Sequence, residues 1–125
     1  MKISVVIPTY NRPDALHRCL NALLDQIGDL SYEIIVVNDG STVSYDKVIE
    51  NVQSITSSIP IAFYEQENSG PAKARNYGVE MAEGDYIAFT DDDCAPHPNW
   101  LMSFMAHAKE GVVLGGHTIN AYRDN

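Results

Sequence analysis

The sequence predicts an α/β fold, in which a mostly parallel sheet is covered by helices on both faces. Two observations lead to this prediction. Strand-like and helix-like segments alternate five times along the chain, and the strand-like runs are apolar at every position instead of every second one. Strands of this kind are buried on both faces, as in parallel sheets that pack between helices. Ligands of such sheets bind beyond the carboxyl ends of the strands, so we expect functional residues there.

The expected strands are short apolar runs rich in β-branched residues, and turn-forming or polar residues follow them. Pro8 ends the first run, and the turn sequence 38–41 (NDGS) ends the second. The fourth run stops at the acidic residues that follow Thr90. The expected strands are Ile3–Ile7, Ile34–Val37, Ile61–Tyr64, Tyr86–Thr90 and Val112–Leu114.

A helical pattern follows each of the first four strands. Asn11 can cap the first helix, Pro13 is tolerated in its first turn, and Gly28 stops its apolar run. The stretch 69–71 (SGP) opens the third helix, and Pro98 opens the fourth. The expected helices run from after Asn11 to Ile27, from Tyr45 to Ser57, from Ala72 to Ala82 and from Pro98 to Ala108.

Length and charge restrict the class of protein. A chain of 125 residues, with 45% hydrophobic and 20% charged residues, is expected to form one domain with its own core. Its 17 acidic residues outnumber the 8 Lys and Arg, and the net charge of −9 makes it a poor candidate for binding nucleic acid. A small phosphorylated ligand fits only where a divalent metal or a local basic cluster offsets the repulsion.

Cysteine usage and hydropathy give an expectation about location. Cys19 and Cys94 are the two cysteines, so neither a disulfide framework nor a thiolate metal site is expected, and a reducing compartment is the default. The N-terminus lacks an apolar segment of signal-peptide length, and no run approaches the ~20 apolar residues of a membrane span. We therefore expect a cytoplasmic protein.

Three consecutive carboxylates, Asp91, Asp92 and Asp93, follow the fourth expected strand. In an extended segment, Asp91 and Asp93 point to one side and Asp92 to the other. Two carboxylates on one side can hold a hard cation such as Mg²⁺ or Mn²⁺. The alternative is a solvated acidic turn without a metal, and the triplet alone does not decide between the two.

Two basic residues lie near the start of the third expected helix. Lys73 and Arg75 follow the stretch 68–71 (NSGP), where backbone N–H groups and the helix dipole favour an anion. A capped surface helix with two solvated charges is the alternative. Asp39 fits either a plain turn or a carboxylate that accepts hydrogen bonds from a base or ribose, and Tyr10 could stack on a flat ring or cover the sheet edge.

These segments together resemble a known family. The order VVIPTYNRPDAL, EIIVVNDGST and NSGPAKARNYGVEMAEGDYIAFTDDD resembles the family 2 glycosyltransferases, which have the Rossmann-like GT-A fold. The resemblance extends from Ile3 to about Gly116 and identifies the nucleotide-binding half. Many members have a further Asp where this chain has Cys94. The nucleotide-binding positions implied by the resemblance are Pro8, Thr9, Tyr10, Arg12, Asp39, Lys73, Arg75, Asp91 and Asp92, and the metal ligand is Asp93.

The resemblance also implies an activity. It implies an inverting transferase that uses a nucleoside diphosphate sugar, most often a UDP-sugar, with Mn²⁺ or Mg²⁺, and a glycan or lipid-linked acceptor. A role in bacterial surface polysaccharide and a place at the inner face of the membrane are implied by the family alone.

The position of the catalytic base gives a further expectation. The family's general base lies well beyond the acidic motif, so we expect it beyond residue 125 and leave the catalytic residue unknown. Residues 1–125 then form the nucleotide-sugar-binding part of the domain without the acceptor-binding half, and the chain alone would transfer sugar weakly or not at all. The surface uncovered in this way would favour self-association.

Three other functions stay open. A receiver domain of the phospho-signalling type also combines five strands, acids and Mg²⁺, but its acids follow the first and third strands. A nucleotidyltransferase needs a Gly-rich basic first loop, where residues 10–13 (YNRP) supply one Arg. A non-catalytic nucleotide-sugar-binding module with the same fold is the main alternative.

Overall fold

A five-stranded sheet with strand order β3-β2-β1-β4-β5 forms the centre of the fold in this computed structural model, which describes residues 2–55, 58–109 and 119–120. The first four strands are parallel, and β5 runs antiparallel to β4. The prediction of a mostly parallel α/β sheet is confirmed. The strands are β1 (Lys2–Thr9), β2 (Ser31–Asn38), β3 (Ile61–Glu65), β4 (Tyr86–Phe89) and β5 (Ile119–Asn120).

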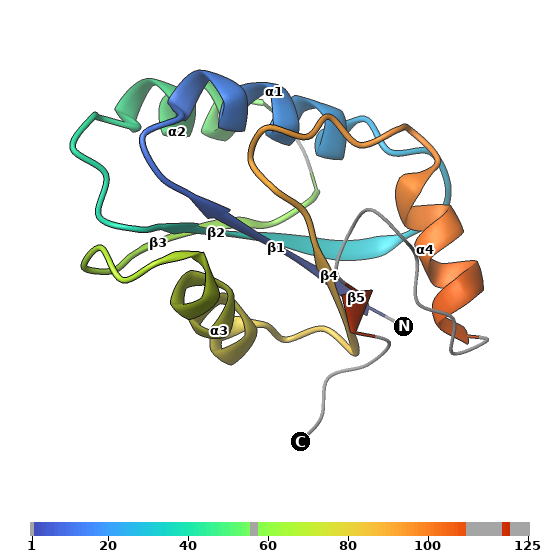
Figure 1. The fold of residues 1–125 in the computed structure, drawn as a ribbon. Helices are drawn as coiled ribbons and strands as arrows, with labels where there is room; N and C mark the ends of the chain where they lie inside the picture. The colour runs from blue at the N-terminus through green and yellow to red at the C-terminus, as the bar shows by residue number, and fades with distance from the viewer. Residues whose placement is uncertain (1, 56–57, 110–118, 121–125) are drawn as a thin grey trace.

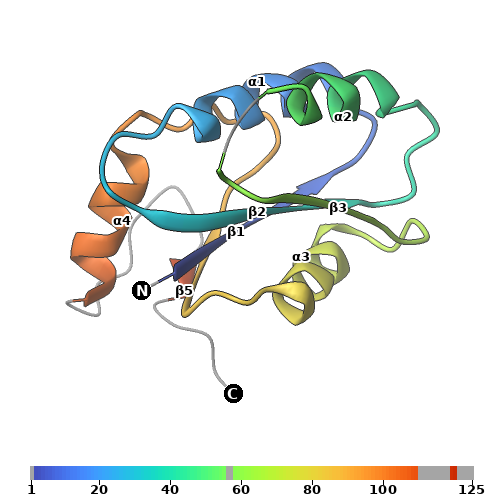
Figure 2. The same cartoon turned by 180° about the vertical axis from the view of Figure 1, so that it is seen from behind.

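Helices cover both faces of this sheet, as expected. Figures 1 and 2 show α1 and α2 over one face, α3 over the other, and α4 beside the end of the sheet where the strands begin. Successive strand residues alternate between two apolar clusters: Val5 packs with α1, α2 and α4, whereas Val6 packs with α3. The helices are α1 (Pro13–Leu24), α2 (Asp46–Gln53), α3 (Pro71–Met81) and α4 (Trp100–Lys109).

Some expected boundaries differ. The first helix ends at Leu24, three residues early, because the N–H of Ile27 donates to the carbonyl of Pro98 and the Gln26 side chain bonds the carbonyls of Ala22 and His97. The second helix ends at Gln53; its expected end, residue 57, lies outside the described residues. So does the expected strand 112–114, whereas the last described strand is β5.

The strand order creates one position suited to a ligand. β1 lies between β2 and β4, so the chain leaves β1 toward α1 on one face and enters β4 from α3 on the other. In open α/β sheets, the crevice beyond the carboxyl ends of strands at such a switch point is the usual binding site. Within the described residues, no helix is long and apolar enough to cross a membrane.

Candidate functional site

A cleft of about 570 Å³ lies beyond the carboxyl ends of β1, β2 and β4. It brings together every expected site residue except Lys73, whose side chain is exposed on α3 and does not line the cleft. The structure adds three residues at the entry to α3, Asn68 and Gly70 before the helix and Pro71 as its first residue, which sequence patterns indicated only as a helix entry. The lining residues are Pro8, Thr9, Tyr10, Arg12, Asp39, Asn68, Gly70, Pro71, Arg75, Asp91, Asp92 and Asp93.

The middle carboxylate of the acidic triplet is buried. Asp92 is 5% exposed, and its Oδ2 accepts a 2.8 Å hydrogen bond from the hydroxyl of Thr9 at the end of β1. Burial raises the pKa of Asp92 above its ordinary value, and the charges of Asp93 and Asp91 add to this rise. The Thr9 bond and the Arg12 guanidinium act in the opposite direction. Through its hydrogen bond with Thr9, Asp92 connects the acidic triplet to the end of β1.

The outer two carboxylates face solvent and pair with arginines. Arg75 Nη2 lies 3.3 Å from Asp91 Oδ1, and Arg12 Nη1 lies 3.3 Å from Asp93 Oδ2 and 3.5 Å from Asp92 Oδ1. Ion pairs this exposed contribute little to stability. They do place two guanidinium groups at the cleft, which partly offset the repulsion among the three acids.

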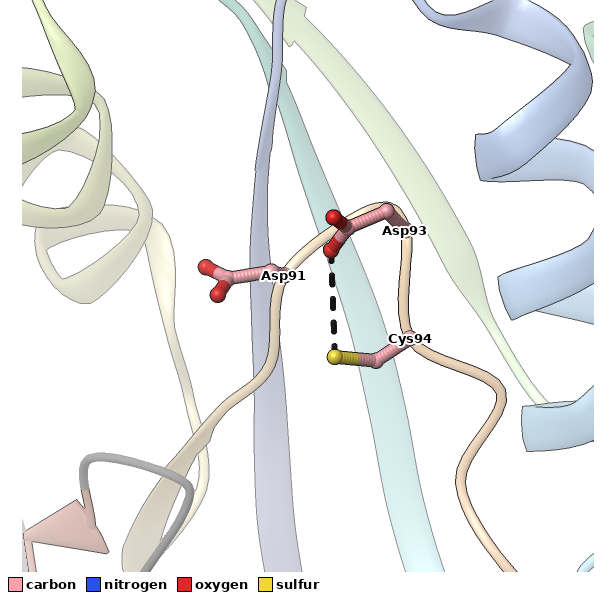
Figure 3. Close-up of side chains that lie close together, drawn as sticks. All are labelled: Asp91, Asp93 and Cys94. Atoms are coloured by element: carbon pink, nitrogen blue, oxygen red, sulfur yellow. Dashed lines mark hydrogen bonds between the residues drawn. The ribbon is translucent and has the colours of Figure 1, made fainter.

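The same turn offers donors for a cation. Within the described residues, a carboxylate oxygen of Asp91, one of Asp93 and the Sγ of Cys94 lie within 4.8 Å of one another. Figure 3 shows the three side chains on the turn after β4, with Cys94 Sγ 3.8 Å from Asp93 Oδ1. Two accessible carboxylates suit Mg²⁺ or Mn²⁺, whereas the thiol is a softer donor. The donor set therefore fits a divalent metal held chiefly by oxygen.

Asp39 connects β2 to the segment before α3. It is 4% exposed, and its Oδ1 accepts from the Gln66 side chain at 2.9 Å and the Ser69 N–H at 2.7 Å. Its Oδ2 accepts from the Gly70 N–H at 3.0 Å and the Asn68 side chain at 3.3 Å. Burial alone would raise the pKa of Asp39, but the hydrogen bonds from Gln66, Ser69 and Gly70 outweigh it, and this pKa lies below its ordinary value.

Gly40 permits this close approach. Its φ of +69° lies in the left-handed region, which suits glycine, and a Cβ there would lie 2.5 Å from the backbone nitrogen of Asn68. The turn after β2 can therefore press against the segment that Asp39 holds. The Asn-Asp-Gly string correctly indicated a turn, but its contact with residue 68 is not visible in the sequence.

Tyr45 is a residue of the site that sequence patterns did not single out. Its hydroxyl lies 2.7 Å from Thr9 Oγ1 and accepts a 2.9 Å hydrogen bond from the Arg12 N–H. The sequence placed it only at the start of a helix. A tyrosine directly behind the turn after β2 was the available signal, because a buried tyrosine hydroxyl requires a polar partner.

Comparison with known proteins identifies the family. The sequence model of glycosyl transferase family 2 matches residues 4–124. The chain belongs to this family. Family membership and the GT-A type of fold, both expected from the resemblance, are thereby confirmed.

This chain is similar to individual glycosyltransferases, but it matches only part of each of them. Glycosyltransferase AglE of Haloferax volcanii is 37% identical over 100 residues, 79% of this chain and 33% of AglE. The crystal structure of S. aureus TarS in complex with UDP-GlcNAc matches with a TM-score of 0.76 and 31% identity, over 88% of this chain and 32% of that chain. This family 2 chain spans about a third or less of the length of the curated relatives it matches.

A further solved structure shares the fold. Mannosyltransferase PcManGT from Pyrobaculum calidifontis, in complex with GDP-Man and Mn²⁺, matches with a TM-score of 0.72 over 86% of this chain and 31% of that chain. Its identity of 24% shows a common fold alone.

Proposed function

We propose that the cleft binds a nucleoside diphosphate sugar, with a UDP-sugar as the first candidate, and serves as the donor site of an inverting glycosyltransferase. One observation supports this most strongly. Carboxylates and guanidinium groups meet in a cleft of about 570 Å³ at the switch point of a family 2 glycosyltransferase fold. The TarS complex supports the choice of a UDP-sugar, because it holds UDP-GlcNAc in a related chain.

The base and ribose are assigned to the loops after β1 and β2. Pro8, Thr9 and Tyr10 would form one wall of the base site, and Tyr10, a residue that is 45% exposed, would stack its ring on the base. Asp39 would accept a hydrogen bond from the base. Because its four acceptor positions are filled, the base would replace one donor, and the 3.3 Å Asn68 contact is the longest.

The diphosphate is assigned to the arginines and the acidic turn. Arg12 and Arg75 already lie at the carboxylates and would turn toward phosphate oxygens, which guanidinium groups bind well. Lys73 is assigned to the diphosphate by the resemblance alone. Asp91 and Asp92 would contact the ribose, the sugar or metal-bound water.

Asp93 is assigned as the metal ligand, for Mn²⁺ or Mg²⁺, with Asp91 beside it. When bound, the ion would supply Lewis-acid stabilisation for the charge on the departing diphosphate. The Asp93 carboxylate is 58% exposed at the cleft, whereas the Asp92 carboxylate is 7% exposed and already accepts a hydrogen bond from Thr9. The net charge of −9 supports such a requirement, because an anionic donor would otherwise meet a repulsive protein.

Transfer requires two further groups. A glycan or lipid-linked hydroxyl would attack the sugar carbon from the face opposite the diphosphate, through an oxocarbenium-like transition state, as the carbon–oxygen bond to the diphosphate breaks. A general base would take the hydroxyl proton. We assign no residue of this chain to that role, because each described carboxylate of the cleft has a role in holding donor or metal.

Calorimetric titration of UDP and of GDP, with Mn²⁺ or with a chelator, tests this function. We expect UDP to bind with Mn²⁺, and the affinity to fall by roughly tenfold or more in Asp93→Asn, because a carboxylate ligand is lost. Asp29→Asn is the matched control, since this exposed acid precedes β2 at the opposite end of the sheet. A folded wild-type chain that binds neither nucleotide would contradict the proposal.

A further inference from the structure

We propose that Tyr45 is a positioning residue of the donor site. Its hydroxyl holds Thr9 and the backbone of Arg12 in place. Through these two residues it fixes the positions of the Asp92 carboxylate and of the Arg12 guanidinium group beside Asp93. This inference rests on the proposed function of the cleft, since it concerns how tightly the cleft holds a nucleotide and a metal.

The side chain of Tyr45 has two parts with separate roles. Its ring belongs to the apolar cluster between the sheet and the helices α1 and α2, and the residue is 6% exposed. Its hydroxyl contacts Thr9 at the end of β1, Arg12 in the loop after β1 and, at 3.5 Å, Ser41 in the loop after β2. Removing the hydroxyl alone therefore affects the cleft loops and leaves the ring packing intact.

The chemistry of the partners fixes the direction of each hydrogen bond. An ionised Asp92 can only accept, so the Thr9 hydroxyl uses its single hydrogen on Asp92 Oδ2 at 2.8 Å. Thr9 must then accept from the hydroxyl of Tyr45 at 2.7 Å. The Tyr45 oxygen in turn accepts the Arg12 N–H at 2.9 Å. A single ordered chain runs from the Arg12 backbone to the Asp92 carboxylate.

This chain closes on itself through the side chain of Arg12. The Arg12 guanidinium lies 3.5 Å from Asp92 and 3.3 Å from Asp93, the acids at the other end of the chain. Backbone and side chain of Arg12 are thus held by the two ends of one network. Without the Tyr45 hydroxyl, the Arg12 N–H loses its acceptor and Thr9 loses its donor. The backbone of Arg12 is then no longer fixed, and its guanidinium group is no longer held beside Asp92 and Asp93.

Tyr45→Phe tests this role, and Tyr32→Phe is its matched control. Tyr32 is a second buried tyrosine and lies near the start of β2, away from the cleft. Its hydroxyl donates a 2.6 Å hydrogen bond to the carbonyl of Leu23 on α1. Both variants lose one buried hydroxyl. We expect UDP affinity in the presence of Mn²⁺ to fall about tenfold in Tyr45→Phe, as for one to two hydrogen bonds, and to stay within about twofold in Tyr32→Phe.

A second readout needs no ligand. The chain of bonds predicts that the Arg12 amide exchanges slowly with deuterium in the wild type and in Tyr32→Phe, and much faster in Tyr45→Phe. A role in general stability alone would speed exchange in both variants alike. Thr9→Val removes the acceptor of the Tyr45 hydroxyl but leaves the Tyr45 oxygen as acceptor of the Arg12 N–H. Because Tyr45 is then less firmly held, Arg12 exchange should speed up by a smaller factor than in Tyr45→Phe, so the test stands even where Tyr45→Phe does not fold.

The outcomes separate the two proposals. If the wild-type chain binds no nucleotide in the presence of Mn²⁺, the proposed function and this inference are both overturned. Wild-type binding with equal affinities in Tyr45→Phe and Tyr32→Phe overturns this inference alone, as does unchanged Arg12 exchange in Thr9→Val. Weakened UDP binding and fast Arg12 exchange in Tyr45→Phe, with neither in Tyr32→Phe, support it.

Discussion

Both carboxylate oxygens of Asp39 accept hydrogen bonds from other residues of the same chain. Two carboxylate oxygens offer about four acceptor sites, and side chains or backbone N–H groups of residues 66–70 fill them. Such a carboxylate holds two segments of the chain together, in addition to the base-binding role that we propose for it. It holds the segment that leads into α3, and with it the start of the helix that bears Arg75.

Asp39→Asn should destabilise the fold by about 1–3 kcal/mol at neutral pH, because an amide NH₂ would face N–H donors. The folded pKa of Asp39 lies below its ordinary value of 3.8, so its contribution is present above that pH and is lost as the pH falls through the folded pKa. Urea unfolding from pH 7 to pH 3 should therefore show the difference between wild type and variant shrinking below about pH 3.8.

Asp85→Asn is the control for this titration, since Asp85 accepts one exposed backbone hydrogen bond from the Lys2 N–H. A difference between wild type and Asp39→Asn that stays constant down to pH 3 would contradict the assignment of an ionised carboxylate that holds these segments together.

At this scale the sequence predicted the cleft carboxylates and their partners Thr9, Arg12 and Arg75, but it did not predict Tyr45 or Gln66. Asp91 and Asp93 could be found because carboxylates after a buried strand form a local pattern. Tyr45 and Gln66 could not, because their bonds to Thr9 and Asp39 join residues 36 and 27 positions apart. Residues 66 and 45 carry ordinary polar groups, and only the sheet brings them to the site.

Among the elements, α3 lies against the sheet because it contains a glycine. A Cβ at Gly78 would overlap the Cγ1 atom of Val6 on β1. Gly78 is buried at the fourth residue from the end of α3, inside the helix, where glycine otherwise weakens a helix. This close approach sets the depth of the helix that bears Arg75 beside the cleft.

Gly78→Ala should therefore destabilise the protein by about 1–3 kcal/mol, although alanine is the better helix former. Asn76→Ala, on the exposed side of α3, should leave stability unchanged or raise it slightly. Val6→Ala opens space under residue 78, so the double variant should be more stable than the sum of the two single losses predicts. Additive losses in thermal unfolding would contradict the packing account.

Element types were easier to predict than element ends. The central strands β1 and β2 are buried on both faces, so an unbroken apolar run marks them. The end of α1 depends on the loop at His97 and Pro98, whose carbonyls accept hydrogen bonds from Gln26 and Ile27. A contact between residues 71 positions apart has no local signature, and the apolar Ile27 continued the helical spacing.

At the scale of the whole molecule, the charge distribution bears on how the proposed anionic ligand would be held in the cleft. The chain carries −9, yet two of its 8 basic residues, Arg12 and Arg75, line this one cleft. They face three carboxylates, so the cleft by itself does not attract a diphosphate. A divalent ion at Asp93 and Asp91 would reverse that balance, so we expect nucleotide binding to depend on the metal.

The most direct measurement of this dependence is Mn²⁺-induced line broadening in ¹⁵N–¹H spectra of the chain, with and without UDP. Mn²⁺ is paramagnetic, so it broadens the amides nearest to it. We predict that broadening centres on residues 91–94, extends to residues 9–12 and 70–75, spares Ser31 and Asp85 at the opposite end of the sheet, and disappears in Asp93→Asn. Broadening centred elsewhere, or unchanged in that variant, would contradict a metal-dependent nucleotide site in this cleft.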